Sequence, residues 1–517
     1  MEQQTRSISM KRMVQEKQVQ ITLEDDFNVP DRKPDVERVI TQEGRIEVGE
    51  INLLNEKILV KGNLHFDLLY LTQEQNPVLQ SIQGKIPFDE MISMENLTEE
   101  LDSKLFWDLE DLNITLINTR KISVRALLSF RCALYEMSEE QVTVDSNDEK
   151  NMEKRFQEFE MTELVLTKKD IARQKEVFRL PAGKPNINQI VYYDIQLLEL
   201  ECRNQDGQIM IRGDLQVFAL YRSRQENGKL NYYEGEQSFC KMLPCENCKE
   251  SMLLQLDSDL QTRELQAKPD EDGENRILEV EIALGISYSL YQKNKVRQLV
   301  DVYSREQSLQ MQKRTIQLHH LMEKRYEQLR INEKVPAETR EQNGQICHCM
   351  GKVLVEESRW EQETITVEGT LEVKILWVEE QENTTVREQK ISLPFRQVVA
   401  EQNKKDGMVH ELKVSLMRVS ANVLGKDQLE VKAELGMELF VFETLTLEDI
   451  SEIKGTPFLA ERMERLPEIV GYTVQQGDTL WSIAKEFLTT EEQILELNQK
   501  SAPTIETGEK LLIGVMQ

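Results

Sequence analysis

The 517-residue sequence is poor in cysteine, in long apolar runs and in the motifs that mark catalytic sites. Its seven cysteines are few for this length and odd in number, which favours free thiols in a reducing compartment over a disulfide framework. No apolar run approaches the ~20 residues that span a bilayer, and residues 1–11 lack the apolar core of a signal peptide. We therefore expect a cytoplasmic protein with no direct membrane insertion.

Positive charge is scarce as well. The sequence has 64 Lys and Arg residues against 92 Asp and Glu residues, so its formal net charge is −28 at pH 7. A negative mean surface potential repels phosphate backbones and anionic lipid head groups. This charge balance argues against nucleic acid and membrane surfaces as partners.

Catalytic and metal-binding motifs are nearly absent. The five histidines include no His-Glu-x-x-His pair, and the sequence has no Gly-x-Ser-x-Gly elbow and no phosphate-binding Gly-x-x-x-x-Gly-Lys-Ser/Thr loop. We predict a non-enzymatic protein without catalytic residues or a cofactor. Cys245/Cys248 and Cys347/Cys349 have the spacing of zinc ligands, but they fall in different predicted domains, so we favour free thiols and predict no metal site. His65 is expected on a solvated strand face.

A domain-sized repeat is present. The segment 60–70 (VKGNLHFDLLY) recurs as 211–221 (IRGDLQVFALY) and 367–377 (VEGTLEVKILW), with apolar residues two, four and six positions after a glycine and an aromatic residue eight positions after it. This alternation predicts a half-buried β-strand, in which the glycine marks a bulge or a close backbone approach. The three glycines are 151 and 156 residues apart, so the repeat unit is a domain of about 150 residues. They are Gly62, Gly213 and Gly369.

Other landmarks recur in register with these glycines. A Pro-x-x-x-Pro motif begins 32 residues before the first two glycines, at Pro30 and Pro181, and the third repeat keeps only Pro336. A proline follows each glycine by 25, 31 and 25 residues, in Pro87-Phe88, Pro244-Cys245 and Pro394-Phe395. Each repeat ends on a second long alternating segment, 122–135, 278–291 or 429–442. Two extended strands with shorter strands between them predict a sandwich- or barrel-like β-domain.

The segments between the repeats have a different pattern. Residues 138–175 and 310–334 are rich in Glu, Lys, Gln and Arg with apolar residues at three- and four-residue intervals, which predicts helical connectors. Residues 447–470 are charged and broken by Gly455, Pro457 and Pro467, which indicates a linker with room for one short helix. The predicted division is 1–145 for the first β-domain, 146–300 and 301–446 for a connector with the second and third β-domains, 447–470 for the linker and 471–517 for a separate module.

The C-terminal module differs from the repeats. A short strand at 472–474 and a turn at Gly477 precede a helix that Asp478 or Thr479 can cap. A second helix fits 490–498, and a last strand fits 511–513. The predicted fold class is therefore mainly β, with three tandem β-rich repeat domains, helical connectors and a small C-terminal βααβ domain.

The module's motif Tyr-x-Val-x-x-Gly-Asp-Thr-Leu-x-x-Ile-Ala, its Leu-Asn pair and its Gly-x-x-Leu-x-Ile strand resemble the LysM domain. Gly514 departs from the proline common in that family. The resemblance implies a groove between the loops 477–480 and 499–505 that binds N-acetylglucosamine units. The implied site residues are Gly477, Asp478, Thr479, Leu480, Asn498, Pro503, Thr504 and Ile505. Gly477, Asp478 and Thr479 also serve the turn and the helix cap, so their presence does not by itself indicate sugar binding.

The three repeats, with their Pro-x-x-x-Pro motif and Val-x-Gly-x-Leu-x-Val strand, resemble the SPOCS domains of spore-forming bacteria. Together with a LysM domain, they resemble the SipL-like spore coat morphogenetic proteins. That resemblance implies a coat assembly adaptor in the mother-cell cytoplasm, at the forespore surface, whose LysM domain binds a SpoIVA-like coat ATPase. The alternative is a protein that binds peptidoglycan of the cortex or wall. The module has three Lys residues against seven Asp and Glu, which favours a protein partner over an anionic wall polymer.

Overall fold

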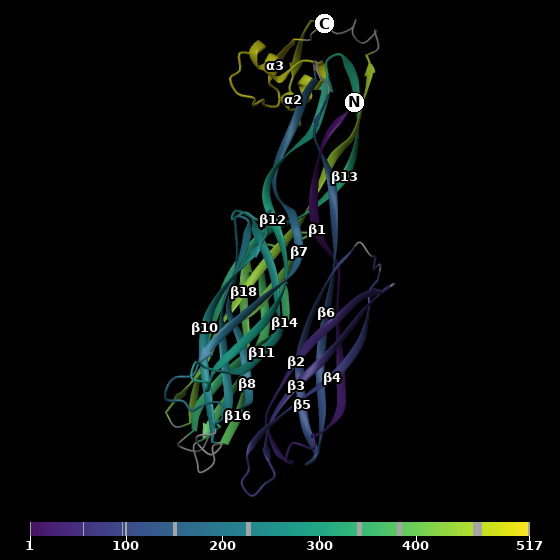
Figure 1. Ribbon diagram of the computed structural model, residues 1–517. Helices are drawn as coiled ribbons and strands as arrows, with labels where there is room; N and C mark the ends of the chain where they lie inside the picture. The colour runs from purple at the N-terminus through teal and green to yellow at the C-terminus, as the bar shows by residue number, and fades with distance from the viewer. Residues whose placement is uncertain are drawn as a thin grey trace.

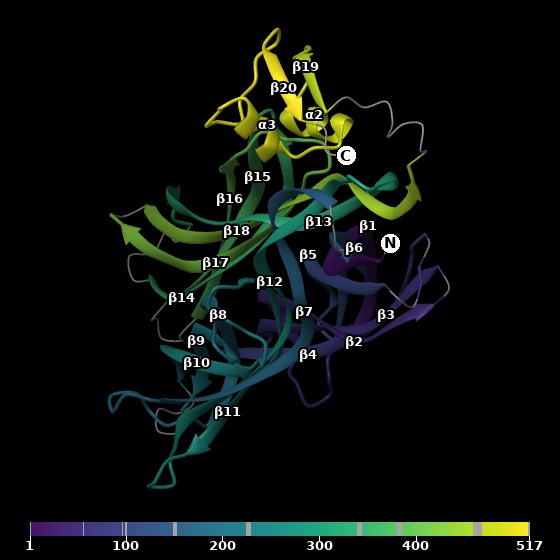
Figure 2. The ribbon, with the colours of Figure 1, turned by 90° about the horizontal axis from the view of Figure 1, so that it is seen from above.

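The structure, a computed structural model, describes residues 2–54, 56–95, 97–98, 101–147, 152–223, 229–338, 344–379, 385–425, 427–458 and 468–514. The described residues form mostly β-strands, with two short helices near the C-terminus. The molecule is elongated: strand-rich bodies lie at one end, long strands form a stalk, and the C-terminal module lies at the stalk tip (Figure 1). Viewed along the stalk, the three repeats lie around a common axis (Figure 2).

Each repeat has six strands in two three-stranded antiparallel sheets, so the prediction of tandem β-domains is confirmed. In each repeat the first, fifth and sixth strands form one sheet and the second to fourth form the other. The first repeat contains β1 (Gln3–Asn28), β2 (Val36–Leu54), β3 (Lys57–Thr72), β4 (Leu79–Ser93), β5 (Asp102–Asn118) and β6 (Lys121–Ser146). The second contains β7 (Met152–Arg179), β8 (Gln189–Gln205), β9 (Gln208–Arg222), β10 (Leu230–Pro244), β11 (Leu253–Pro269) and β12 (Asn275–Ser304). The third contains β13 (Gln307–Pro336), β14 (Gly344–Glu361), β15 (Thr364–Glu379), β16 (Thr385–Glu401), β17 (Val409–Leu424) and β18 (Gln428–Pro457).

The two sheets of a repeat enclose one hydrophobic core. In the first repeat, Leu64 and Phe66 of β3 pack with Val124 and Leu128 of β6, and all four side chains are buried. The second and third repeats have matching cores. The apolar alternation seen in the sequence therefore does mark the buried faces of two facing sheets, as in a β-sandwich.

The glycine of each repeat lies opposite a phenylalanine on the neighbouring strand. Gly62 pairs with Phe88, Gly213 with Phe239 and Gly369 with Phe395. The phenylalanine follows its glycine by 26 residues in all three repeats. This register corrects one alignment made from sequence: Pro244-Cys245 is not the counterpart of Pro87-Phe88, because the equivalent aromatic residue is Phe239.

The predicted helical connectors are wrong. Within the first, residues 138–146 belong to β6 and residues 152–175 to β7, and the second, 310–334, lies in β13. The first long strand of each repeat carries a β-bulge at the same register position, at Val14, Val165 and Met322. A bulge inserts one residue and so reverses which side chains face inward. The apolar spacing across the bulge then mixes two- and three-residue steps, which resembles a helical period.

Beyond the bulges, the long strand pairs leave their sandwiches and pack together as the stalk (Figure 1). Met10, Met161 and Leu318, each four residues before its bulge, meet in one buried cluster that combines all three repeats. Farther toward the tip, Leu299 and Val302 of β12 pack with Ile450 and Ile453 of β18. The stalk is therefore a shared core, which no single repeat can form alone.

The repeats also meet at the opposite end of the molecule. Leu69, Leu220 and Leu376, each seven residues after its glycine, belong to one buried cluster. At the same interface His348 of β14 is buried between two carboxylates of the second repeat, with its Nδ1 2.8 Å from Glu234 Oε1 and its Nε2 3.1 Å from Asp194 Oδ2. The face of the central strand opposite the sandwich core is thus buried against the other repeats.

The C-terminal module is βααβ, as predicted. It consists of β19 (Ile469–Thr473), α2 (Leu480–Phe487), α3 (Glu491–Leu497) and β20 (Lys510–Gly514), with β19 and β20 paired antiparallel. The predicted linker 447–470 is wrong over its first part, since residues 447–457 belong to β18. Residues 459–467 of the predicted linker, which has room for one short helix, lie outside the described residues.

Candidate functional site

The first candidate loop of the C-terminal module is held by internal hydrogen bonds. Gly477 has a φ of +95°, a conformation that favours glycine. The Asp478 carboxylate accepts hydrogen bonds from the hydroxyl of Tyr472 (2.8 Å) and the backbone amide of Gln475 (2.7 Å). The Thr479 hydroxyl accepts from the Ser482 amide (3.0 Å) in a capping box at the start of α2. The polar side chains of this loop are therefore engaged in the fold of the module.

Asn498 connects the second helix to the last strand. Its amide nitrogen donates to the carbonyls of Ile494 (2.8 Å) and Leu512 (2.6 Å), and its carbonyl oxygen accepts from the Leu512 amide (2.8 Å). All of these contacts are inside the module. Asn498 is thus a structural bridge between α3 and β20, although the resemblance placed it among the binding residues.

The remaining candidates divide between the core and the surface. Leu480 is buried, and Ile505 packs partly against the same hydrophobic cluster, which brings the two predicted groove loops to one core. Gly477, Thr479, Pro503 and Thr504 are exposed. These four residues, and the backbone around them, are the part of the predicted site that a ligand can reach.

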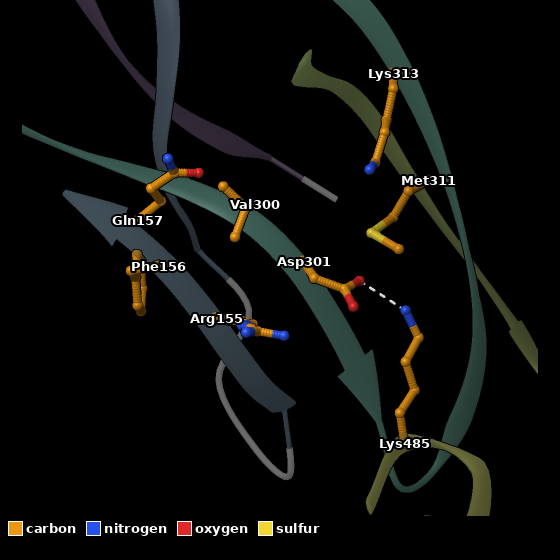
Figure 3. A pocket seen from close by; sticks show the side chains of 8 residues that line it. All are labelled: Arg155, Phe156, Gln157, Val300, Asp301, Met311, Lys313 and Lys485. Atoms are coloured by element: carbon orange, nitrogen blue, oxygen red, sulfur yellow. Dashed lines mark hydrogen bonds and ion pairs between the residues drawn. The ribbon is translucent and has the colours of Figure 1, made fainter. Parts of the chain in front are cut away.

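The module is docked onto the stalk through residues that the sequence analysis did not select. Trp481 Nε1 donates to Asp301 Oδ2 (2.7 Å). Lys485 Nζ donates to Asp301 Oδ1 (2.6 Å) (Figure 3). The hydroxyl of Tyr303 donates to the carbonyl of Thr489 (2.6 Å). Asp301 and Tyr303 belong to β12, so one strand of the second repeat holds the first helix of the module.

Tyr303 also completes the hydrophobic core of the module. It is 4% exposed, belongs to the module's core cluster and packs edge-on against Trp481 with ring centroids 5.0 Å apart. Burial by itself raises the pKa of the Asp301 carboxyl, but the hydrogen bonds from Lys485 and Trp481 outweigh this effect and lower the pKa below its usual value. Asp301 therefore stays ionised and keeps both hydrogen bonds.

The cysteine pairs do not converge. Cys347 and Cys349 lie on opposite faces of β14, one in the inter-repeat cluster and one in the sandwich core of the third repeat. Cys245 and Cys248 are buried in the core of the second repeat, and burial raises the pKa of the Cys248 thiol to about 11. Among the residues that the structure describes, no three His, Cys, Asp or Glu side chains are grouped to hold a metal ion. His65 is partly exposed and pairs with Glu47.

No helix in the described part of the chain is long and apolar enough to cross a membrane. Two cavities, of about 510 and 480 Å³, lie outside the predicted groove. The first lies beside the docked module, and the second lies next to Gly62 and Phe88 in the first repeat.

Comparison with protein families identifies four domains. Residues 472–514 match the LysM domain, and three segments, 35–117, 186–268 and 344–424, match the family described as SipL, SPOCS domain. Each SPOCS match covers the second to fifth strands of a repeat, so the two long strands that form the stalk lie outside it. No curated protein and no solved structure matches the chain.

Proposed function

As one of the SipL-like proteins, which join SPOCS domains to a C-terminal LysM domain, this chain is, we propose, a non-enzymatic adaptor in spore coat assembly. In this proposal its LysM domain binds a SpoIVA-like coat ATPase in the mother-cell cytoplasm, at the forespore surface. The three SPOCS repeats form the body that carries the LysM domain.

The observation that carries this proposal is the docking of the LysM domain at the tip of the stalk. Asp301 and Tyr303 fix helix α2, and the strands that carry the stalk come from all three repeats. A binding domain that is fixed to a long rigid body holds its partner at a defined distance and orientation from whatever the body contacts. This arrangement supports an assembly role.

A partner would be recognised through the exposed groups of the groove. The side chains of Asp478, Thr479 and Asn498 make hydrogen bonds inside the domain. A partner therefore meets backbone groups and the small exposed side chains of Thr479, Pro503 and Thr504. Exposed backbone groups and small side chains of this kind can contact a protein surface. Net negative charge on the domain further disfavours an anionic polymer.

The test is capture of a purified SpoIVA-like ATPase by the full-length protein, compared with a Thr504→Arg variant and a deletion of 471–517. A bulky cation in the groove should weaken capture by at least tenfold, about 1.4 kcal/mol. Thr115→Arg is the matched control, because Thr115 is exposed on β5 of the first repeat. Equal capture by the wild-type protein, the Thr504 variant and the deletion would refute the proposed adaptor role.

Glycan binding is the second candidate, because LysM domains generally bind glycans such as N-acetylglucosamine. Titration of the full-length protein with N-acetylglucosamine oligomers measures this directly. Saturable binding that Thr504→Arg removes and Thr115→Arg preserves would favour a protein of the cortex or cell wall.

A further inference from the structure

A cavity of about 510 Å³ lies at the joint between the LysM domain and the stalk. It is lined by residues of β7, β12 and β13 and by Lys485 of α2 (Figure 3). The cavity therefore combines two repeats with the LysM domain, and Lys485 lines it only while that domain is docked. It is separate from the groove considered above.

Positive charge predominates in this cavity. Its charged lining residues are Arg155, Lys313 and Lys485 against the single carboxylate of Asp301. Both carboxylate oxygens of Asp301 already accept hydrogen bonds, one from Lys485 and the other from Trp481. The charge of the lining therefore favours an anionic ligand, although the chain as a whole has a net charge of −28.

Two of the cations remain available to a ligand. The guanidinium group of Arg155 makes no hydrogen bond or ion pair with any residue in the described part of the chain, and it interacts with Glu491 only at longer range. Lys313 Nζ lies 3.2 Å from Glu448, whose side chain is 71% exposed. A surface ion pair of this kind contributes about 0–1 kcal/mol and can be exchanged for a better one.

The rest of the lining is partly apolar. Phe156 and Met311 line the cavity, and the guanidinium group of Arg297 lies 3.6 Å from the centroid of the Phe156 ring. The side chains of Phe156 and Met311 also pack partly against the stalk core at Leu299 and Ile453, so apolar surface lies next to the cations of the cavity. A site that binds inorganic phosphate alone would not need the apolar side chains of Phe156 and Met311.

We propose that this joint binds a short acidic peptide segment of a partner protein. Arg155 and Lys313 pair with Asp or Glu carboxylates of the peptide, and an apolar side chain of the peptide packs on Phe156 and Met311. An extended nucleic acid is disfavoured, because the surrounding negative charge repels a long polyanion while a few residues of peptide fit the cavity. The inference does not depend on what the LysM groove binds.

The test uses the full-length protein and a fluorescein-labelled hexapeptide, Glu-Leu-Glu-Glu-Phe-Glu, in a fluorescence anisotropy titration at low salt. We expect saturable binding that the double variant Arg155→Glu/Lys313→Glu weakens by at least tenfold. The matched control, Arg203→Glu/Lys390→Glu, makes the same charge change at exposed positions of the second and third repeats and should leave binding within twofold. Thr504→Arg should also leave it unchanged, which separates this site from the groove.

Three results would overturn the proposal: no saturable binding, equal weakening by the control variant, or equal binding of a peptide with Gln in place of Glu. Complete displacement by millimolar inorganic phosphate would assign the cavity to simple anions instead. Circular dichroism and thermal unfolding establish that each variant is folded. Should the charge-reversal variant be unstable, Arg155→Gln/Lys313→Gln removes the same cations without adding carboxylates and is expected to weaken binding at least fivefold.

Discussion

The repeated glycine faces an aromatic ring in all three sandwiches, and the room around it differs between repeats. A Cβ atom on Gly62 would lie 2.6 Å from the Phe88 ring and would also collide with the carbonyl of Glu47. On Gly369 it would lie 2.8 Å from the Phe395 ring. On Gly213 the nearest atoms are 3.2 Å away. For Gly62 and Gly369 the closest atom to the added Cβ is a backbone carbonyl oxygen of the neighbouring strand, that of Glu47 and that of Leu354, respectively. Glycine is therefore required at these two positions by the adjacent backbone together with the ring packed over it.

We predict that Gly62→Ala and Gly369→Ala destabilise the protein by about 1–3 kcal/mol, the usual cost of overpacking. Gly213→Ala should cost less, because its neighbours need to move only slightly. Gly183→Ala is the control, since a Cβ atom added at Gly183 would have no neighbouring atom within 4 Å. Urea unfolding measures the differences, and equal effects at all four positions would contradict the explanation.

His348 shows how a single buried residue couples two repeats. Burial by itself lowers the pKa of this imidazole, but the hydrogen bonds to Asp194 and Glu234 outweigh it and raise the pKa to about 9. The ring also stacks on Phe218, with centroids 4.4 Å apart. The charged form is therefore the one that the interface between the second and third repeats stabilises.

The stability of this interface should depend on pH. Because the pKa of His348 in the folded state is above its value of about 6.5 in the unfolded state, its contribution is complete below pH 6.5 and is lost as the pH rises through 9. We expect a loss of roughly 3 kcal/mol or less across this range. His348→Gln should remove this part of the pH dependence, measured as the difference between the unfolding midpoints of the two proteins. If the unfolding midpoints of the wild-type protein and the variant change in parallel from pH 6.5 to 9.5, His348 does not carry a proton there.

At the scale of the strand, the sequence predicted the sandwich and failed on the stalk. In the sandwich, alternation runs unbroken from Leu64 to Leu68 because one face meets one core. In β13, Ile316 and Leu318 face the stalk core, whereas Ile331 and Val335 face the sandwich core after the bulge at Met322. A charged sequence whose apolar residues change phase in this way fits a helical period. Only the pairing register with the partner strand distinguishes such a bulged strand from a helix.

Deleting one bulge residue is therefore expected to be far more harmful than changing its side chain. Val14 is 42% exposed, and Val14→Ala should change stability by no more than about 0.5 kcal/mol. Removing Val14 altogether turns Ile8 and Met10 away from the stalk core, at roughly 1.5–3 kcal/mol for each side chain. Denaturant unfolding of both variants tests this, and similar stabilities would mean that the bulge does not set the phase of β1.

At the scale of the whole molecule, the sequence motif predicted the fold of the LysM domain and the structural roles of Asp478 and Thr479. It gave no sign of the docking, because the acceptor of Trp481 is Asp301, 180 positions earlier in the chain at the end of β12. That pairing depends on how far the stalk extends, and the sequence pattern favoured helices over much of the stalk. The orientation of the domain thus follows from long-range packing.

Docking through Asp301 makes the stability of the LysM domain depend on the stalk. In Asp301→Ala, the indole nitrogen of the buried Trp481 and the ammonium of Lys485 both lose their acceptor, at about 1.5–3 kcal/mol for a hydrogen bond to a charged group. We expect faster amide hydrogen exchange in α2 and at Thr489 while the sandwich strands keep their protection. Asp170→Ala is the control, because Asp170 is also on a long strand but pairs with the exposed Lys168. Unchanged hydrogen exchange in α2 would mean that the core of the LysM domain is stable without support from the stalk. Tyr303 would then cover this core without stabilising it.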